Sequence, residues 1–398
     1  DPKLVDDFLA LDVEWRNLTK EVDELRAKQN ELSAQRNIEE GKKVKTRIQD
    51  SETNLKRLEA NRQSVLEQIP NLPASDVPVG KNESENVVLK EAGNKPEFDF
   101  EPKDHVELGK TLDIIDFEAA SKVAGSGFYY LKNEGVLLEL ALVRYALGFL
   151  ARNGFSLWIT PDLAREKFYL GTGYSPRGEE AQTYVIENTD LGLIATAEVT
   201  LAGIHADEIL DEKNLPKLYA GYSHCFRQEA GAYGKYSKGL YRLHQFTKVE
   251  MFAYTKPEDS PKIHEKLLAL EEGLWQGLGI PYRVIEMCAG DLGAMAAKKY
   301  DLEAWMPGRA APEGRAKGDW GEVTSASNTT DYQARRLNIK FREKAGKVQF
   351  AHTLNGTALA TSRALIAILE NYQTKEGGVI IPEVLRDYVG KSAIKPPK

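Results

Sequence analysis

The sequence predicts an α+β protein in which an N-terminal antiparallel helical coiled-coil arm precedes a domain of mixed strands and helices. Two heptad series occupy the N-terminal region, a Pro-, Asn- and charge-rich stretch follows, and strand-like and helix-like patterns alternate in the rest of the chain. With 398 residues and 42% hydrophobic residues, the chain is long enough for one large domain or two ordinary ones. The expected boundaries are an arm over residues 1–72, a linker over 73–107 and a larger domain over 108–398.

The arm is expected to consist of two long helices. The polar segment Asn37–Lys43 should fold the second helix back on the first, and Ile69–Pro73 should end it, because proline cannot continue a helix. Such an arm could be a dimerisation coiled coil or could project to contact a large ligand, and periodicity alone does not choose. The two series are Phe8, Leu11, Trp15, Leu18, Val22, Leu25, Gln29 and Leu32, then Val44, Ile48, Ser51, Leu55, Leu58, Arg62, Val65 and Ile69.

Composition excludes several classes of protein. Two cysteines, Cys225 and Cys288, rule out a disulfide scaffold and suggest a reducing compartment. The six histidines show no spacing typical of a structural zinc site, and no apolar run approaches the length of a membrane span. The net charge of −7 argues against bulk, non-specific binding of nucleic acid but leaves room for a local basic patch. We therefore expect a cytoplasmic protein with no membrane association, and an organellar matrix stays open.

The stretch Cys225–Phe252 has the pattern of a β-hairpin with a basic, glycine-rich loop. Its second strand should place an aromatic residue, Phe246, in the middle of a charged row, where it needs a partner to stack on. Phe246 and Glu250 should lie about 13 Å apart, which suits an elongated ligand with a flat ring at one end and an amine or hydroxyl at the other. The row comprises Arg242, His244, Phe246, Lys248 and Glu250.

With Arg227 and Glu229 on the partner strand, this hairpin could hold a nucleotide. The alternative is an ordinary antiparallel strand with its polar face in water. Known phosphate loops do not explain the charges, since the chain has no GxxxxGK[ST] motif and Gly171–Gly173 lacks the third glycine of the dinucleotide fingerprint.

Two further clusters point to phosphate chemistry. Glu322 and Ser325 offer the hard oxygen ligands that Mg²⁺ prefers, although the same stretch could be a turn-rich connection whose polar residues satisfy local backbone groups. Arg363 falls near the start of a predicted helix, where a cation opposes the helix dipole unless an anion lies beside it. A surface arginine is the alternative for that position.

Together these segments resemble the class II aminoacyl-tRNA synthetases, and the seryl-tRNA synthetases in particular. The likeness covers nearly the whole chain, and several long motifs occur in the right order. The second and third class signatures resemble "CFRQEAG" (225–231) and "TALATSR" (357–363), and the seryl branch resembles "TAEVTLAG" (196–203), "LHQFTKVE" (243–250), "SASNTTDYQARR" (325–336) and "LENYQ…IIPEVLRDY" (369–388). The resemblance implies that residues 108–398 form a class II catalytic domain, built on an antiparallel β-sheet flanked by helices.

The resemblance also implies roles for individual residues. Arg227 would grip the α-phosphate of ATP, Phe246 would stack on the adenine, and Arg363 would cover its other side. The implied catalytic residues are Arg227, Glu322 and Arg363, and the implied Mg²⁺ ligands are Glu322 and Ser325. The implied ATP-binding residues are Arg227, Gln228, Glu229, Arg242, Leu243, Phe246, Glu322, Val323, Thr324, Ser325 and Arg363. The implied serine-binding residues are Thr196, Ala197, Glu198, Arg227, Glu250, Asn355 and Thr357.

The activity that the resemblance implies is ATP- and Mg²⁺-dependent formation of seryl-adenylate, followed by transfer of serine to serine tRNA. The enzyme would be a homodimer with Pro161 at the interface, and its arm would contact the tRNA; charging of selenocysteine tRNA stays open. Two alternatives are a related ligase that charges a carrier protein, which would not need the arm, and a non-catalytic paralogue, which predicts loss of the phosphate-binding residues. The sequence departs from the family pattern in an apparent insertion at 310–319, and in Tyr236 and Thr357.

Overall fold

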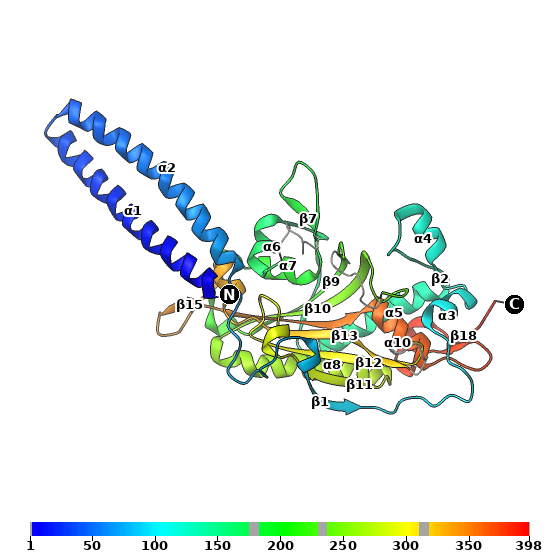
Figure 1. Ribbon diagram of the computed structural model, residues 1–398. Helices are drawn as coiled ribbons and strands as arrows, with labels where there is room; N and C mark the ends of the chain where they lie inside the picture. The colour runs from blue at the N-terminus through cyan, green and yellow to red at the C-terminus, as the bar shows by residue number, and fades with distance from the viewer. Residues whose placement is uncertain (1, 175–182, 230–236, 310–317, 398) are drawn as a thin grey trace. The chain divides into compact units, whose positions relative to one another are not determined.

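The computed structural model describes residues 2–174, 183–229, 237–309 and 318–397 (Figure 1). The chain divides into two compact units, Asp1–Pro70 and Asn71–Lys398. The first unit is a pair of helices, α1 (Pro2–Ala34) and α2 (Ile38–Gln68). They are antiparallel, since early residues of α1 contact late residues of α2, as in the 2.7 Å hydrogen bond from Arg62 Nε to Asp12 Oδ1.

The seam between α1 and α2 is the one that the heptads predict. Its buried apolar side chains are Val22, Leu25, Leu32, Val44 and Leu58. The polar heptad position Arg62 is accommodated because its guanidinium binds the buried Asp12 and lies over the Trp15 ring, 4.9 Å from its centroid. The predicted helical arm is thereby confirmed as two packed helices.

The turn between these helices is shorter than predicted. Asn37–Lys43 was expected to be the connection, but only Asn37 lies outside α2. The Asn37 side chain accepts a hydrogen bond from Glu40 N, and Glu39 and Glu40 occupy the first turn, where carboxylates favour the positive end of the helix dipole. Gly41 is therefore a buried helical residue facing Gln29 rather than a break.

The second unit is built on an eight-stranded sheet in which every pairing except β4–β9 is antiparallel, so the predicted α+β fold is confirmed (Figure 1). The strand order is β1 (Val87–Ala92), β11 (Tyr282–Glu286), β12 (Lys298–Met306), β13 (Asp319–Asn328), β16 (His352–Ala360), β10 (Gln245–Thr255), β9 (Lys217–Phe226) and β4 (Ser156–Ile159). The hairpin of β9 and β10 thus lies beside β16 and β13, which come from distant parts of the sequence.

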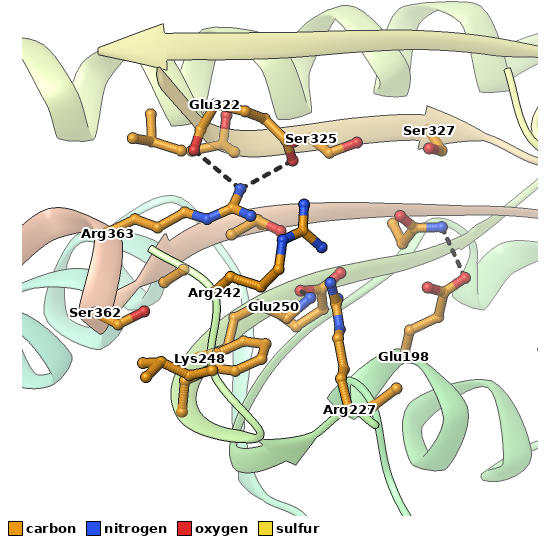
Figure 2. A pocket seen from close by; sticks show the side chains of 18 of the residues that line it. Glu198, Arg227, Arg242, Lys248, Glu250, Glu322, Ser325, Ser327, Ser362 and Arg363 are labelled. Atoms are coloured by element: carbon orange, nitrogen blue, oxygen red, sulfur yellow. Dashed lines mark hydrogen bonds and ion pairs between the residues drawn. The ribbon is translucent and has the colours of Figure 1, made fainter. Parts of the chain in front are cut away.

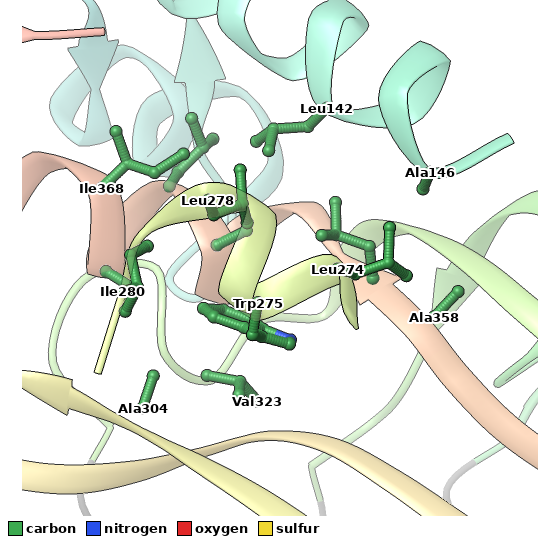
Figure 3. Close-up of a cluster of buried hydrophobic side chains, with 14 of the residues drawn as sticks. Leu142, Ala146, Leu274, Trp275, Leu278, Ile280, Ala304, Val323, Ala358 and Ile368 are labelled. Atoms are coloured by element: carbon green, nitrogen blue, oxygen red, sulfur yellow. The ribbon is translucent and has the colours of Figure 1, made fainter. Parts of the chain in front are cut away.

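Three helices pack against one face of this sheet and form the main core with it (Figure 3). They are α5 (Glu134–Arg152), α8 (Ser260–Leu278) and α10 (Thr361–Asn371). Trp275 of α8 is fully buried and lies close to Val323 of β13 and Ala304 of β12. Burying one such aromatic side chain contributes roughly 2–3 kcal/mol to stability. These three helices therefore stabilise the sheet through the face that they cover.

The opposite face carries smaller elements. Helix α7 (Ala197–Gly203) packs on β9 and β10 through a second apolar cluster that includes Leu201, Tyr219 and Phe252.

The remaining helices are α3 (His105–Thr111), α4 (Phe117–Ala124), α6 (Glu166–Thr172), α9 (Tyr332–Arg336) and α11 (Glu383–Val389), with short 3₁₀ turns at Glu83–Glu85, Glu212–Asn214, Pro257–Asp259 and Ala289–Asp291. The remaining strands are β2 (Ile115–Asp116), β3 (Tyr130–Leu131), β5 (Leu163–Arg165), β6 (Tyr184–Val185), β7 (Leu191–Leu193), β8 (Ile209–Asp211), β14 (Lys340–Arg342), β15 (Val348–Phe350), β17 (Val379–Ile380) and β18 (Ala393–Ile394).

Residues 73–107, expected to form a linker, belong to the second unit instead. They contain β1, which pairs with β11 at one edge of the large sheet, and the first residues of α3. The unit begins at Asn71, whose backbone N–H donates to Ala294 O at 2.8 Å. Local composition did not predict the strand, because β1 forms by pairing with β11, which is distant in the sequence.

Within the part of the chain that the structure describes, every helix is too short or too polar to cross a membrane.

Candidate active site

A cavity of about 410 Å³ lies against the central strands of the sheet (Figure 2). Its walls come from the connection between β9 and β10, from β10, β12, β13 and β16, and from the first turns of α7 and α10. Among its lining residues are Glu198, Arg227, Glu229, Arg242, Leu243, Phe246, Glu250, Glu322, Val323, Thr324, Ser325, Asn355, Thr357 and Arg363. Most of the residues singled out from the sequence are therefore brought to one place.

A β-bulge explains how Glu322 and Ser325 can share the cavity. Residues three apart in a regular strand point to opposite faces of the sheet. Between β12 and β13, Leu302 pairs with Thr324 but Glu303 pairs with Glu322, so Val323 has no partner. The extra residue turns Glu322 to the face that carries Ser325, and Val323 packs into the main core.

A second bulge does the same on β16. Val249 pairs with Leu359 while Glu250 pairs with Thr357, which leaves Ala358 without a partner. Asn355 and Thr357 thus face the cavity together with Ala360, three positions further along. Both bulges lie next to the cavity, which is where bulges commonly re-aim side chains.

The hairpin ends earlier than the sequence predicts. β9 ends at Phe226 and β10 begins at Gln245, so Arg227, Glu229 and Arg242 lie in the connection and not on the strands. The Arg227 guanidinium is 5.3 Å from the centroid of the Phe246 ring, and Arg242 forms an ion pair with Glu229. The cluster is therefore held by side-chain contacts, not by strand alternation.

His244 does not share the cavity with its predicted neighbours. Its ring stacks on Phe128, with centroids 5.3 Å apart, and its Nδ1 lies 2.8 Å from the Tyr184 hydroxyl. Phe246, Lys248 and Glu250, which lie within β10, do line the cavity together. Alternation holds only where the strand is regular.

Two buried carboxylates, Glu198 and Glu250, mark one end of the cavity (Figure 2). Glu198 Oε1 accepts hydrogen bonds from Gln333 Nε2 at 2.7 Å and Asn355 Nδ2 at 2.8 Å. Lys248 Nζ lies 2.5 Å from Glu250 Oε2, as an ion pair that does not have hydrogen-bond geometry. One lysine faces two carboxylates, so this end of the cavity suits a cationic ligand group.

Burial raises the pKa of Glu198 to about 7, and the nearby Glu250 adds to the increase. The folded protein therefore holds a proton on this carboxyl at pH values where an unfolded chain, with a pKa near 4.5, does not. The stabilisation, on the order of 3 kcal/mol, is present below pH 4.5 and is lost as the pH rises through 7. Ionising the buried Glu198 carboxyl therefore costs free energy. A bound cation would offset this cost because it stabilises the ionised form.

Arg363 and Glu322 mark the opposite end of the cavity (Figure 2). Arg363 NH1 lies 3.1 Å from Glu322 Oε1 and donates to the Glu322 carbonyl oxygen at 2.9 Å. Although burial opposes the shift, the Arg363 guanidinium lowers the pKa of Glu322, so this carboxylate stays ionised. The Glu322 side chain is 44% exposed and can still reach a ligand in the cavity.

The oxygen atoms at this end suit a divalent cation only in combination with a ligand. No group of three or more His, Cys, Asp or Glu side chains in the described ranges forms a metal cage. The Glu322 carboxylate and Ser325 hydroxyl offer two oxygen donors, and Mg²⁺ characteristically takes the rest from phosphates and water. The donor set therefore fits a Mg²⁺ ion that arrives with a phosphorylated substrate.

Three predicted site residues do not line the cavity. Thr196 is the buried N-cap of α7, and its hydroxyl accepts a hydrogen bond from Glu198 N at 3.3 Å. Ala197 packs in the second apolar cluster, and Gln228 donates to Thr183 O at 2.9 Å. Their neighbours in the motifs reach the cavity, and these three hold the backbone behind it.

Sequence reasoning missed several lining residues. Tyr174 donates to Glu198 Oε2 at 3.1 Å, and Lys299 lies 3.7 Å from Asp301, whose pKa burial raises to about 7. Of these, Lys299 left a signal, because Lys299, Asp301 and Glu303 alternate with Tyr300, Leu302 and Ala304 along β12. The other missed lining residues are Ala195, Tyr241, Leu292, Met295, Ser327, Ala360 and Ser362.

Two features noted in the sequence lie partly outside the described residues. Residues 230–236, which include Tyr236 and most of the expected glycine-rich loop, and residues 310–317 of the apparent insertion are not described. Lys238, two residues after the first of these segments, forms an ion pair with Asp104.

Comparison with known proteins identifies the family. Residues 1–73 match the model of the seryl-tRNA synthetase N-terminal domain, and residues 183–372 match that of the class II tRNA synthetase core domain (G, H, P, S and T). A serine–tRNA ligase from Dictyoglomus thermophilum is 54% identical over 99% of this chain and 93% of the relative. The arm and the catalytic unit are thus both represented in the match.

Solved structures give the same result. Seryl-tRNA synthetase from Pyrococcus horikoshii, complexed with ATP, has a TM-score of 0.89 and 44% identity over 100% of this chain and 94% of that chain. Cytoplasmic serine–tRNA ligase from Naegleria fowleri, in complex with AMP, has a TM-score of 0.85 and 38% identity over 100% and 93%. The chain belongs to the seryl-tRNA synthetase family of class II aminoacyl-tRNA ligases.

Proposed function

We propose that this protein activates L-serine with ATP to form seryl-adenylate and pyrophosphate, and then transfers serine to the 3′ end of serine tRNA. The observation that supports this most is a single cavity with buried carboxylates at one end and arginines around an aromatic ring at the other. Such a cavity matches a substrate pair with an ammonium group at one end and a nucleoside phosphate at the other.

ATP would lie at the arginine end. The adenine would stack on Phe246, opposite Arg363, and its amino group would donate to Glu229. Arg227, which already lies over the Phe246 ring, would turn its guanidinium to the α-phosphate. Two solved relatives are complexed with ATP and AMP, which supports an adenine nucleotide as a ligand of this protein.

Serine would lie at the carboxylate end. Its ammonium group would pair with Glu198, and its hydroxyl would donate to Glu250, with Asn355 and Thr357 alongside. Alanine and glycine lack the hydroxyl, so they would leave a buried Glu250 oxygen without a hydrogen-bond donor. Threonine would have to be excluded by the walls, which is a weaker filter because one methyl group is worth only about 1–3 kcal/mol.

The chain's own residues would catalyse adenylation mainly by positioning and charge stabilisation. The serine carboxylate attacks the α-phosphorus in line with the departing pyrophosphate, without a covalent enzyme intermediate. Arg227 would hold the α-phosphate, Arg363 the γ-phosphate, and Arg242 would complete the wall. When bound at Glu322 and Ser325, Mg²⁺ would supply neutralisation of the phosphate charge.

We assign serine tRNA to the arm and a second copy of the chain to the edge strand β4. Leu157, Trp158 and Ile159 of β4 are exposed, with Ile159 81% exposed, and the neighbouring α5 exposes Leu137 and Leu140. An apolar strand edge of this kind commonly pairs with another chain, which supports a homodimer with Pro161 at its border. The two buried free cysteines suit the cytoplasm as a reducing compartment.

The two alternative activities are less well supported. A ligase for carrier proteins would not need the arm, and the arm matches the family's N-terminal domain. A non-catalytic paralogue predicts decay of the cavity, whereas Arg227, Glu250, Glu322 and Arg363 all line it.

Purified protein is expected to catalyse ATP–pyrophosphate exchange that depends on serine and on Mg²⁺. Glycine and alanine should each support less than about 1% of the exchange seen with serine, because a site built around a hydroxyl rejects analogues that lack it by large factors. The measurement is incorporation of labelled pyrophosphate into ATP, with each amino acid in turn and with EDTA. No exchange with serine would overturn the proposed function.

The kcat/KM for serine in this exchange should fall as the pH is lowered through about 7. Protonated Glu198 cannot pair with the serine ammonium group, so each pH unit below 7 should cost up to about tenfold. Glu198→Gln keeps the shape and removes the titration, so its kcat/KM should be low and flat over the same range. A wild-type profile that is flat between pH 5.5 and 8 would contradict this role for Glu198.

A further inference from the structure

A buried histidine–glutamate pair lies behind the ATP end of the cavity and outside its lining. His105, the first residue of α3, and Glu370, near the end of α10, are both fully buried. His105 Nδ1 lies 2.8 Å from Glu370 Oε1, and the His105 backbone N–H donates to the same oxygen at 3.0 Å. On the other side of the ring, Leu240 N–H donates to His105 Nε2 at 3.1 Å.

These contacts determine the protonation of the ring. Nε2 accepts a hydrogen bond from a backbone N–H, so it carries a lone pair and no hydrogen. Nδ1 must then carry the hydrogen and donate it to the Glu370 carboxylate. His105 is thus a neutral Nδ1–H tautomer, and its role as acceptor for Leu240 depends on the carboxylate behind it.

The Leu240 N–H belongs to a segment that forms part of the cavity wall. The next residue, Tyr241, lies between Arg363 and Arg309, with each guanidinium carbon 4.9 Å from its ring centroid. Arg242 follows and forms the ion pair with Glu229. A shift at Leu240 would therefore displace residues at the ATP end of the cavity.

The second oxygen of the Glu370 carboxylate holds a segment that packs against the same wall through Tyr241. Glu370 Oε2 accepts from Gly308 N at 2.9 Å, and Gly308 precedes Arg309. Glu370 thereby joins the two segments that meet at Tyr241, one directly and one through the His105 ring. Both Glu370 oxygens accept hydrogen bonds. A glutamine of the same shape would place its NH2 group against one of these N–H donors, so it cannot replace the carboxylate.

The close approach of these segments is built into the backbone. Gly239 has φ +59°, and a Cβ there would lie 2.2 Å from His105 Nε2. A glycine at this position lets the backbone reach the ring and supplies the left-handed turn. The Asp104–Lys238 ion pair closes the same junction from the surface.

We propose that His105 and Glu370 are positioning residues that hold the Leu240–Arg242 and Gly308–Arg309 segments in place for ATP binding. The inference rests on the proposed function, since it assigns ATP to this end of the cavity. Neither residue would contact substrate. The serine end, formed by Glu198 and Glu250, is held by separate contacts and would be unaffected.

Two substitutions of His105 separate its two hydrogen bonds. His105→Gln places an acceptor near the position of Nε2, so Leu240 N–H keeps a partner and the Glu370 bond is lost. His105→Asn places a donor near the position of Nδ1, so the Glu370 bond is kept and Leu240 N–H is left buried without a partner. In ATP–pyrophosphate exchange, His105→Asn should raise the KM for ATP about tenfold and leave the KM for serine within about twofold. His105→Gln should restore the KM for ATP to within about threefold of wild type.

A matched control is His205→Asn, which removes a histidine that pairs with Glu208 at 2.7 Å and lies outside the cavity lining. Both KM values should stay at the wild-type level. Equal KM values for ATP in the Gln and Asn variants, or parallel increases in the KM values for ATP and serine, would overturn the proposal.

A measurement on the wild-type chain keeps the inference testable if the variants do not fold. In the ¹⁵N spectrum of histidine-labelled protein, the ring assigned to His105 among the six histidines should be neutral, with hydrogen on Nδ1 and none on Nε2, and it should lose that tautomer in Glu370→Gln. A charged His105 ring, or hydrogen on Nε2 of His105, would contradict the inference. Absence of exchange in wild-type protein would instead overturn the proposed function, and the spectrum would still decide the state of His105.

Discussion

Arg227→Ala is expected to reduce serine-dependent ATP–pyrophosphate exchange by about 10²–10³-fold. Arg227 lines the cavity, and its guanidinium lies over the Phe246 ring, where the proposed mechanism places ATP. In the proposed mechanism it contacts the α-phosphate, where negative charge accumulates during attack by the serine carboxylate. Loss of one preorganised donor at such a position typically costs 10²–10³ in rate.

The measurement is the exchange rate at saturating serine and ATP, together with both KM values. Because the interaction would strengthen as charge develops, kcat should fall more than the KM for ATP rises. Arg342→Ala provides the control, since Arg342 lies on β14 with an exposed side chain and is not part of the cavity lining. A loss below about tenfold for Arg227→Ala, or ~1.4 kcal/mol, would mean that the α-phosphate assignment is wrong.

Deletion of residues 8–69 is expected to reduce charging of serine tRNA by about 100-fold while serine-dependent exchange persists. The two units are separately compact, and the second has its own core around Trp275. The deletion removes most of two antiparallel helices. Because they are antiparallel, the start of α1 lies beside the end of α2, so the chain can be rejoined there. Adenylation needs only the cavity, whereas charging would also need the tRNA contact of the arm.

Charging and exchange are measured on the same preparation, so that exchange reports on the folding of the second unit. Charging that stays within about threefold of the full-length chain would remove the tRNA role of the arm. Loss of exchange together with charging would show that the cavity depends on the arm, which contradicts the proposed division of labour. Either result would also favour the alternative hypothesis that the arm is a dimerisation coiled coil.

The outcomes for particular elements show which kinds of pattern can be interpreted from sequence. The heptads of the arm predict α1 and α2 well, because the side chains of a helix pair meet at a fixed period whatever else surrounds them. The polar segment at 73–107 does not predict β1, since pairing with β11 depends on a strand that lies almost 200 residues away in the sequence. The start of the second arm helix was misplaced for a local reason, as the cap formed by Asn37 outweighs the low helix propensity of Gly41.

In the cavity, too, residue type could be interpreted from the sequence, whereas side-chain direction could not. Glu322 and Ser325 were paired on chemical grounds, but only the bulge at Val323 turns them to one face. Thr196, Ala197 and Gln228 stand beside cavity residues in their motifs, yet they face the scaffold. Tyr174 and Met295 line the cavity from segments without any motif of their own.

The sequence alone determined the α+β class, the helical arm, the family and the set of charged and aromatic residues that the chemistry requires, because each of these depends on residue type and local spacing. Only the tertiary structure decided which of those residues share a cavity, how Arg363 holds Glu322, and how His105 and Glu370 support the wall from behind. Side-chain direction at a bulge and contact between distant segments depend on long-range pairing and burial, which no local pattern records.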